Sequence, residues 1–281
     1  MSNLALISIV TPSFNQVPYI AEALRSVKDQ RFPAVEHIVI DGGSTDGTVE
    51  YLQSLSGHPD WRHLRWISEP DNGQSEALNK GFRMATGGVI GWLNSDDRYR
   101  PGCFEKVAGA FSTNSAVDVL YGDFTWIDEH GRFLQIRREV TFNPFVLLYH
   151  RTLCVPSPSS FFRRKIFDDG NFIDVSFDYS MDWEFFVRLH LNGYRFQHLQ
   201  ATIADFRWQP NSKSSKCLAG QHRDRDRILD QYAAPLQKCP PATRPLCLLG
   251  LRSAAALRYW SEKFVRGYYF ERWFQSGYEL R

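Results

Sequence analysis

The chain has 281 residues, of which 43% are hydrophobic and 23% charged, and its formal net charge is +2. This composition is typical of a globular protein with enough material for one large domain or two closely joined halves. The small positive excess excludes a dedicated nucleic-acid binder, because such a protein neutralises many phosphates. No apolar run reaches the roughly 18 residues that a membrane-spanning helix needs, and the first ten residues lack the basic region of a signal peptide.

Strand-like and helix-like segments alternate along the first hundred residues. Short apolar runs predict strands at Ile7–Thr11, Ile38–Ile40, Leu64–Ile67 and Val89–Leu93. Apolar residues at helical spacing predict the intervening helices at Tyr19–Gln30, Thr48–Leu55 and Ser75–Met84. Because parallel strands are joined by crossover helices, this alternation predicts an α/β fold with a mostly parallel, twisted sheet flanked by helices.

The pattern loosens after Pro101. Further elements are predicted as a helix at Phe104–Phe111, strands at Val117–Tyr121, Gly122–Ile127 and Phe133–Arg137, an extended connection at Val155–Ser160, and a helix at Met181–Asn192. A polar loop then leads to a charged helix at Gln221–Tyr232, a proline-rich joint and a basic helical tail at Leu246–Phe274. These last segments predict a C-terminal helical extension.

Carboxylates follow two of the predicted strands. Asp96 and Asp97 come directly after Val89–Leu93, and Asp41 follows Ile38–Ile40. Because the carboxyl ends of parallel strands meet at the edge where open α/β sheets bind ligands, one site is expected there. Neighbouring carboxylates suit a hard divalent cation with oxygen ligands. Taken alone, an Asp pair favours a solvated turn, and Asp41 could equally be an ordinary turn residue.

Other kinds of site are excluded by their spacing rules. The segment Gly42–Gly47 is not G-x-G-x-x-G, has no Lys-Ser/Thr pair after it, and does not form G-x-S-x-G. The eight His residues show no HxxxH or HExxH spacing, which argues against zinc. The five Cys residues include no CxxC pair, so free thiols in a reducing compartment, the cytoplasm, are expected.

Four motifs, in the same order, resemble those of family 2 glycosyltransferases: Thr11–Asn15, Ile40–Thr48, Gly73–Gly81 and Trp92–Asp97. The resemblance is close over the first hundred residues and looser to about Ser215. It implies a GT-A (Rossmann-like) domain at 1–215, with a nucleotide-binding half at 1–100 and an acceptor half at 101–215, followed by the helical extension at 216–281.

The resemblance also implies a role for each matching residue. The nucleotide base would be flanked by Thr11, Pro12 and Phe14 and hydrogen-bonded by Asp41. The nucleotide and its diphosphate would run beside Gln74, Asn79 and Lys80. Mg²⁺ or Mn²⁺ would be held by Asp97, the more certain ligand, with Asp96 turned towards the ribose or the metal.

The resemblance places the catalytic base at an acidic pair that opens a helix in the second half. Here Met181 replaces the first acidic residue of that pair, so Asp182 is the expected base and Glu184 the alternative. A polar loop that closes over the donor in the family corresponds to Phe206–Ser214, where Arg207 or Lys213 would contact the diphosphate. Gln209 stands near the place where relatives can carry a His ligand, which leaves a third metal ligand open.

The implied activity is the transfer of a sugar, with inversion, from a nucleoside diphosphate donor to a hydroxyl acceptor. UDP is the first choice of nucleotide, and dTDP and GDP stay open. The acceptor would be a saccharide or a lipid-linked saccharide in polysaccharide, glycolipid or glycan assembly. The alternatives are a non-catalytic nucleotide-sugar-binding protein of the same fold and, less favoured, a nucleotidyltransferase. The tail 244–274 could contact the inner face of a membrane, its own domain or a second subunit.

Overall fold

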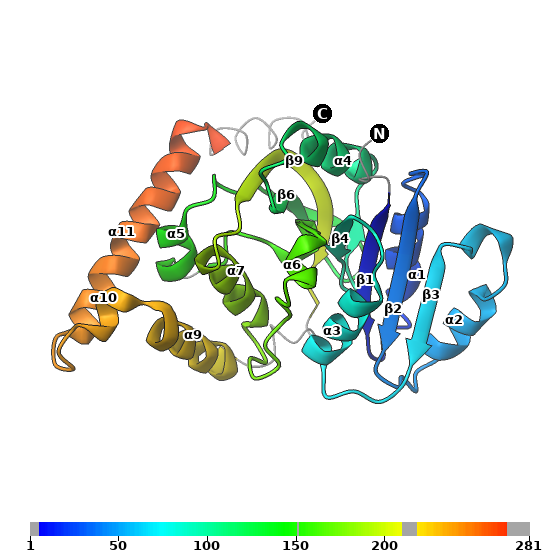
Figure 1. Cartoon of the computed structure of the whole chain (residues 1–281), viewed down its shortest axis with the longest axis horizontal. Helices are drawn as coiled ribbons and strands as arrows, with labels where there is room; N and C mark the ends of the chain where they lie inside the picture. The colour runs from blue at the N-terminus through cyan, green and yellow to red at the C-terminus, as the bar shows by residue number, and fades with distance from the viewer. Residues whose placement is uncertain (1–5, 151, 210–217, 269–281) are drawn as a thin grey trace.

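The structure is a computed structural model that describes residues 6–150, 152–209 and 218–268. One nine-stranded sheet runs through it: eight strands follow the order β3-β2-β1-β4-β8-β6-β9-β5, and the ninth, β7, pairs with β6. Figure 1 shows helices on both faces of this curled sheet and a group of C-terminal helices at one end of the molecule. None of the helices within the described ranges is both long enough and apolar enough to cross a membrane.

The first half is the predicted parallel sheet. Its strands are β1 (Ile7–Ser13), β2 (Val35–Asp41), β3 (Leu64–Ser68) and β4 (Val89–Trp92), and β1–β2, β2–β3 and β1–β4 all pair in parallel. β1 and β4 are buried throughout. This explains their continuous apolar sequences, since a parallel strand is covered on both faces.

The two faces of this half are covered by different helices. On one face α3 (Gln74–Met84) packs on alternate residues of β1 and β2, among them Val10 and Ile38. On the other face lie α1 (Ile20–Lys28) and α2 (Thr48–Leu55), against Val39 of β2. The prediction of strand–helix alternation is confirmed in this half.

The second half continues the same sheet mainly with antiparallel pairs. Its strands are β5 (Arg98–Tyr99), β6 (Val119–Ile127), β7 (Phe133–Arg137), β8 (Ser160–Arg163) and β9 (Phe196–Arg207). β8 pairs antiparallel with β4 and β6 and so joins the two halves. β9 runs parallel to β6 with register shifts around Asp123, and its curved path is visible in Figure 1.

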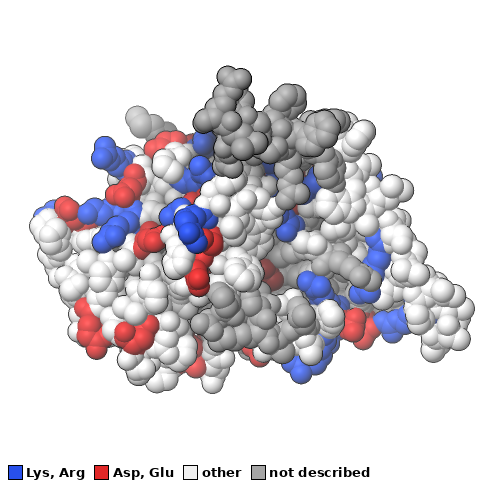
Figure 2. Space-filling model, turned by 180° about the vertical axis from the view of Figure 1, so that it is seen from behind, with Lys and Arg blue, Asp and Glu red and all other residues white. Residues whose placement is uncertain are grey.

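The remaining helices are α4 (Cys103–Thr113), α5 (Pro144–Tyr149), α6 (Lys165–Asp168), α7 (Met181–Leu191), α9 (Leu218–Tyr232), α10 (Ala234–Gln237) and α11 (Arg244–Val265), with short 3-10 helices at Pro59–Trp61 and Ser157–Ser159. The C-terminal helices pack on α5 through a small apolar cluster that includes Tyr149, Leu229 and Ala255. α11 covers the predicted helical tail as far as Val265, and residues 269–274 of that prediction lie outside the described residues. Viewed from behind, acidic and basic side chains are interspersed, in keeping with the small net charge (Figure 2).

Candidate active site

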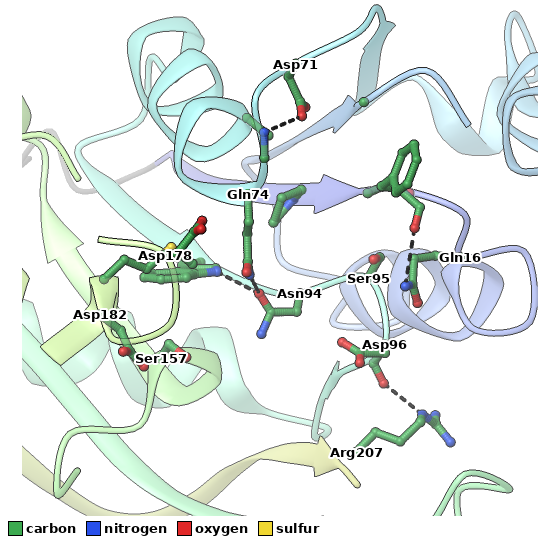
Figure 3. Close-up of a pocket in the computed structure, with 18 of the residues that line it drawn as sticks. Gln16, Asp71, Gln74, Asn94, Ser95, Asp96, Ser157, Asp178, Asp182 and Arg207 are labelled. Atoms are coloured by element: carbon green, nitrogen blue, oxygen red, sulfur yellow. Dashed lines mark hydrogen bonds between the residues drawn. The ribbon is translucent and has the colours of Figure 1, made fainter. Parts of the chain in front are cut away.

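A cavity of about 560 Å³ opens at the carboxyl ends of β1 and β4. Its walls come from the end of β1, the loops that follow β2, β3 and β4, the first turns of α3 and α7, and the end of β9. Figure 3 shows Asp96 and Arg207 on one side of this cavity and Asp182 with Ser157 on the other. The site therefore combines elements of both halves of the sheet.

The two acidic residues after β4 lie in different environments. Asp96 lines the cavity, and its Oδ2 accepts a hydrogen bond of 2.6 Å from Gln209 Nε2. Asp97 is buried and does not line the cavity; its Oδ1 accepts from the Arg207 amide at 2.9 Å and its Oδ2 from Asn94 Nδ2 at 3.0 Å. The carboxylate of Asp96 therefore faces the cavity, whereas that of Asp97 is bonded to groups inside the protein.

The surroundings raise the pKa of both carboxylates. Burial raises the pKa of Asp96, while the hydrogen bond from Gln209 acts in the opposite direction. Burial, followed by the charge of Asp96, holds the pKa of Asp97 well above its ordinary value. A buried carboxylate is stabilised in its charged form by a nearby cation, so the electrostatics of this turn favour a cationic ligand at Asp96.

Arg207 supports the acidic turn from behind. Its Nε donates to the carbonyl of Asp96 at 2.8 Å, its Nη1 to two carbonyls in the β6–β7 turn, and its Nη2 to Glu22 at 2.7 Å. The side chain is fully buried, although the residue contributes to the cavity wall. The guanidinium is thus occupied by protein acceptors, and the expected diphosphate contact gains no support from this arrangement. Lys213, the other candidate, lies outside the described residues.

Of the residues predicted to surround the nucleotide base, some line the cavity and others are buried. Pro12 and Phe14 line the cavity, and the Phe14 side chain is 60% exposed. Thr11 is buried, with its Oγ1 2.8 Å from His37 Nε2. Asp41 is also fully buried, and it organises the loop after β2 by accepting hydrogen bonds from the amides of Gly43 and Ser44 and from the side chains of Ser44 and Ser68. The structure does not bring Thr11 or Asp41 to the cavity wall.

Asp71 lines this part of the cavity instead. Its Oδ1 accepts from the Gly73 amide at 2.9 Å, and a Cβ atom on Gly42 would lie 2.9 Å from its Oδ2. Gly42 therefore gives the Asp71 carboxylate room beside the loop after β2. Sequence reasoning missed this residue, although β3 is a third strand that ends in acidic and turn-forming residues.

The three polar residues predicted on α3 have separate roles. Gln74 lines the cavity, and its Nε2 donates to Asn94 Oδ1 at 2.8 Å. Asn79 is buried and exchanges two hydrogen bonds of 2.8 Å with the backbone of Ile173. Lys80 forms an ion pair with Glu69 at 2.5 Å. Only Gln74 of the three reaches the cavity wall.

The acceptor side of the cavity is formed by the start of α7. Asp182 lies in its first turn and lines the cavity, and its Oδ1 accepts from the Trp183 amide at 2.8 Å. Glu184 is buried away from the cavity, paired with Arg188 and with the Tyr232 hydroxyl at 2.7 and 2.6 Å. Of the two candidate bases, only Asp182 faces the cavity. Ser157, Asp178 and Tyr179 also line this side, and sequence reasoning did not identify them.

The residues present fit a cation that arrives together with a diphosphate. In the described part of the chain, no three His, Cys, Asp or Glu residues are grouped so that they could hold a metal ion by themselves. Mg²⁺, however, is commonly bound through one or two carboxylates with substrate phosphates completing its shell. Asp96 can supply such a carboxylate at the cavity wall.

Comparisons with known proteins agree with this geometry. The family model "Glycosyl transferase family 2" matches residues 8–170. An uncharacterized glycosyltransferase of Mycobacterium tuberculosis strain CDC 1551 is 32% identical over 193 residues, which are 68% of this chain and 71% of that protein. The putative teichuronic acid biosynthesis glycosyltransferase TuaG of Bacillus subtilis is 37% identical over 101 residues, 36% of this chain and 40% of that protein.

Solved structures show the same fold at low sequence identity. S. aureus TarS 1–349, crystallised with UDP-GlcNAc, superposes with a TM-score of 0.67 and 18% identity over 94% of this chain and 75% of that one. The mannosyltransferase PcManGT from Pyrobaculum calidifontis, in complex with GDP-Man and Mn²⁺, gives a TM-score of 0.56 and 19% identity over 89% of this chain and 73% of that one. Together with the match of the family model, these findings establish that the fold is GT-A and that the chain belongs to glycosyl transferase family 2.

Proposed function

We propose that the protein is an inverting glycosyltransferase that moves a sugar from a nucleoside diphosphate donor to a hydroxyl acceptor. The observation that carries this proposal is the presence of two carboxylates, Asp96 and Asp182, on opposite sides of one cavity (Figure 3). One carboxylate lies where the carboxyl ends of the parallel strands would receive a nucleotide. The other opens a helix from the second half of the chain.

The donor would lie along the wall formed by the first half. The nucleobase would contact Pro12 and Phe14, and the Asp71 carboxylate can accept a hydrogen bond from the ring N–H of uracil, thymine or guanine. UDP is our first choice of nucleotide. The diphosphate would lie towards Gln74 and Asp96. Mg²⁺ or Mn²⁺ bound at Asp96 would neutralise the charge that develops on the leaving diphosphate.

Asp182 would act as the general base. Its carboxylate removes the proton from the acceptor hydroxyl as that oxygen attacks the anomeric carbon. The bond from this carbon to the diphosphate oxygen breaks on the opposite face, so the configuration at the carbon inverts. The first turn of α7 suits this role, because the positive end of a helix dipole favours an ionised carboxylate.

The acceptor would be a saccharide or a lipid-linked saccharide, and the process the assembly of a polysaccharide or glycolipid. The similarity to TuaG, whose name places it in teichuronic acid biosynthesis, supports this setting. We also propose that the protein contacts the inner face of a membrane through α11. Exposed apolar residues of that helix support this contact, and its test is given in the Discussion.

The experiment is calorimetric titration of UDP, GDP, dTDP and CDP, with and without Mn²⁺, into the wild type, Asp96→Asn and Asp182→Asn. We expect one diphosphate to bind in a metal-dependent manner, with binding at least about tenfold weaker in Asp96→Asn because a charged ligand is lost. Asp182→Asn should keep this affinity but release nucleotide from the matching nucleotide sugar at least about 100-fold more slowly, as expected for loss of a general base.

Two outcomes would contradict the proposal. If no nucleotide binds to the wild type, the cavity is not a donor site. If the wild type binds a nucleotide but transfers the sugar of none of its conjugates, either to water or to a panel of saccharide and lipid-linked acceptors, the non-catalytic alternative holds. Full turnover by Asp182→Asn would leave the donor site standing and remove the assignment of the base.

A further inference from the structure

The segment that leads into α7 is held by a residue from the C-terminal helices. Asp224, on α9, is 1% exposed. Its Oδ2 accepts hydrogen bonds from the backbone amides of Asp178, Tyr179 and Ser180, at 3.1, 2.7 and 3.2 Å. One carboxylate oxygen thus accepts hydrogen bonds from three consecutive N–H groups that lie more than forty residues earlier in the chain.

These amides belong to the wall of the active site. The cavity is lined by Asp178 and Tyr179 and, after Ser180, by Met181 and Asp182. The first amides of a helix have no partner within it, and Ser180, at the N-cap position of α7, makes no side-chain capping bond. Asp224 satisfies the amide of this N-cap residue and the two amides before it, whereas the Trp183 amide inside the first turn donates to Asp182 Oδ1.

Two other residues of α9 hold the same segment. Arg227 donates to the carbonyl and the hydroxyl of Ser176, at 2.8 and 3.0 Å, and its guanidinium lies 4.1 Å from the centre of the Phe177 ring. Tyr232 donates to Glu184 Oε1 at 2.6 Å, inside α7. α9 thus holds residues 176–184 at both ends, with Asp224 in contact with the middle.

We propose that Asp224 is a positioning residue that orients the catalytic base and the acceptor side of the cavity. Hydrogen bonds from N–H groups to an ionised carboxylate are stronger than neutral ones, and this carboxylate is shielded from water. By fixing the amides of residues 178–180, it determines where the first turn of α7 begins and thus where the Asp182 side chain points. This inference rests on the proposed function.

The inference assigns a catalytic contribution to a helix outside the family match. The match ends at residue 170, and α9 begins at Leu218. The donor wall, by contrast, is built from the first half of the chain and makes no use of Asp224. Loss of Asp224 should therefore affect turnover much more than nucleotide affinity.

The test compares Asp224→Ala and Asp224→Asn with Asp226→Asn, a change of an exposed carboxylate on the same helix. We expect Asp224→Ala to lower kcat at least tenfold while the Kd of the nucleotide found above changes less than threefold. Asp224→Asn should recover part of kcat, because an amide oxygen still accepts hydrogen bonds, and Asp226→Asn should match the wild type. Amide hydrogen exchange of residues 178–180 should accelerate in Asp224→Ala.

The outcomes separate this inference from the proposed function. If the wild type binds no nucleotide, the proposed function fails. If the wild type is active and folded Asp224→Ala keeps full kcat, Asp224 is not a positioning residue. Equal losses in nucleotide affinity and kcat would also overturn the inference, because they would indicate a general structural role. Should Asp224→Ala not fold, the same comparisons apply to Asp224→Asn.

Discussion

At the scale of single residues, Glu139 is a buried carboxylate that lies away from the cavity. It is fully buried between the end of β7 and α11, with its Oε1 2.7 Å from Arg137 Nε. Burial raises its pKa to about 7, although the charges of Arg137 and Lys263 act in the opposite direction. In the unfolded chain a Glu carboxyl has its ordinary pKa, close to 4.5.

This pKa shift predicts a pH-dependent stability. A folded-state pKa above the unfolded value means that the folded state keeps the proton longer, so the contribution is present below about pH 4.5 and is lost as the pH rises through 7. Relative to Glu139→Gln, the wild type should lose up to about 3 kcal/mol of unfolding free energy between pH 5 and pH 8. Urea unfolding of both proteins at several pH values measures this difference. A difference that is constant, or that grows in favour of the wild type, would contradict the assignment.

The residue scale is also where sequence reasoning was least sufficient. The motif predicted that Asp96 and Asp97 belong to the site, but which carboxylate faces the cavity depends on Arg207 and Gln209, more than 100 residues away. A turn points adjacent side chains in different directions, and the local sequence does not show which distant residues each side chain will contact. For Asp182 and Glu184 the helical period was sufficient, because residues two positions apart point to different faces.

At the scale of elements, α3 illustrates how closely a helix approaches the sheet. Gly81 lies on its inner face, where an added Cβ would overlap the side chain of Val10 and lie 3.3 Å from Ile40 Cγ1. We expect Gly81→Ala to destabilise the protein by about 1–3 kcal/mol, because overpacking outweighs the gain in helix propensity. Urea unfolding provides the measurement.

Gly109 provides the matched control for this substitution. It lies within α4, is exposed, and has no atom within 4 Å of an added Cβ. Gly109→Ala should therefore stabilise the protein by about 0.5–1 kcal/mol through helix propensity alone. If both variants were stabilised, the close approach of α3 to β1 would not be as tight as the structure indicates.

Elements were predictable where burial is uniform. β1, β2 and β4 could be predicted because each contains a compact, buried apolar run. β3 is only partly buried and was predicted from Leu64, Trp66 and Ile67. β8 and β9 were missed for physical reasons: β8 has four residues within a Ser- and Pro-rich segment, and β9 carries polar side chains such as His198 and Asp205 that are paired within the fold. Such polar residues interrupt the period-two pattern on which strand prediction depends.

At the scale of the whole molecule, α11 forms an outer edge. Figure 1 shows it at the end of the molecule opposite β3 and α2. One face packs inward through Ala255 and Tyr259. The opposite face carries large apolar side chains that are 48% to 72% exposed: Leu246, Leu249, Leu257, Trp260 and Phe264. We refer to these five residues as the apolar stripe of α11.

The charges along α11 indicate what could cover this stripe. Residues 244–266 include five Lys and Arg and a single Glu. Three of these cations are already engaged in the fold, because Lys263 lies towards Glu139 and Arg244 and Arg266 pair with Asp230 and Glu262. The case for a membrane therefore rests mainly on the apolar side chains, which can enter the headgroup region of a bilayer. A glycosyltransferase with a lipid-linked acceptor would gain by lying at that surface. These features favour a membrane surface as the occupant of the stripe.

The prediction is tested by sedimentation with vesicles of phosphatidylglycerol and phosphatidylcholine. The wild type should bind vesicles rich in phosphatidylglycerol, more weakly as salt is raised, because screening reduces the attraction of exposed cations. Leu257→Glu combined with Phe264→Glu should abolish binding, since each change places a carboxylate on the inserting face. Leu191→Glu, at the exposed end of α7, is the control and should bind like the wild type. If the wild type ignores both vesicles and instead dimerises through the stripe, a second copy of the chain covers it and the membrane assignment is wrong.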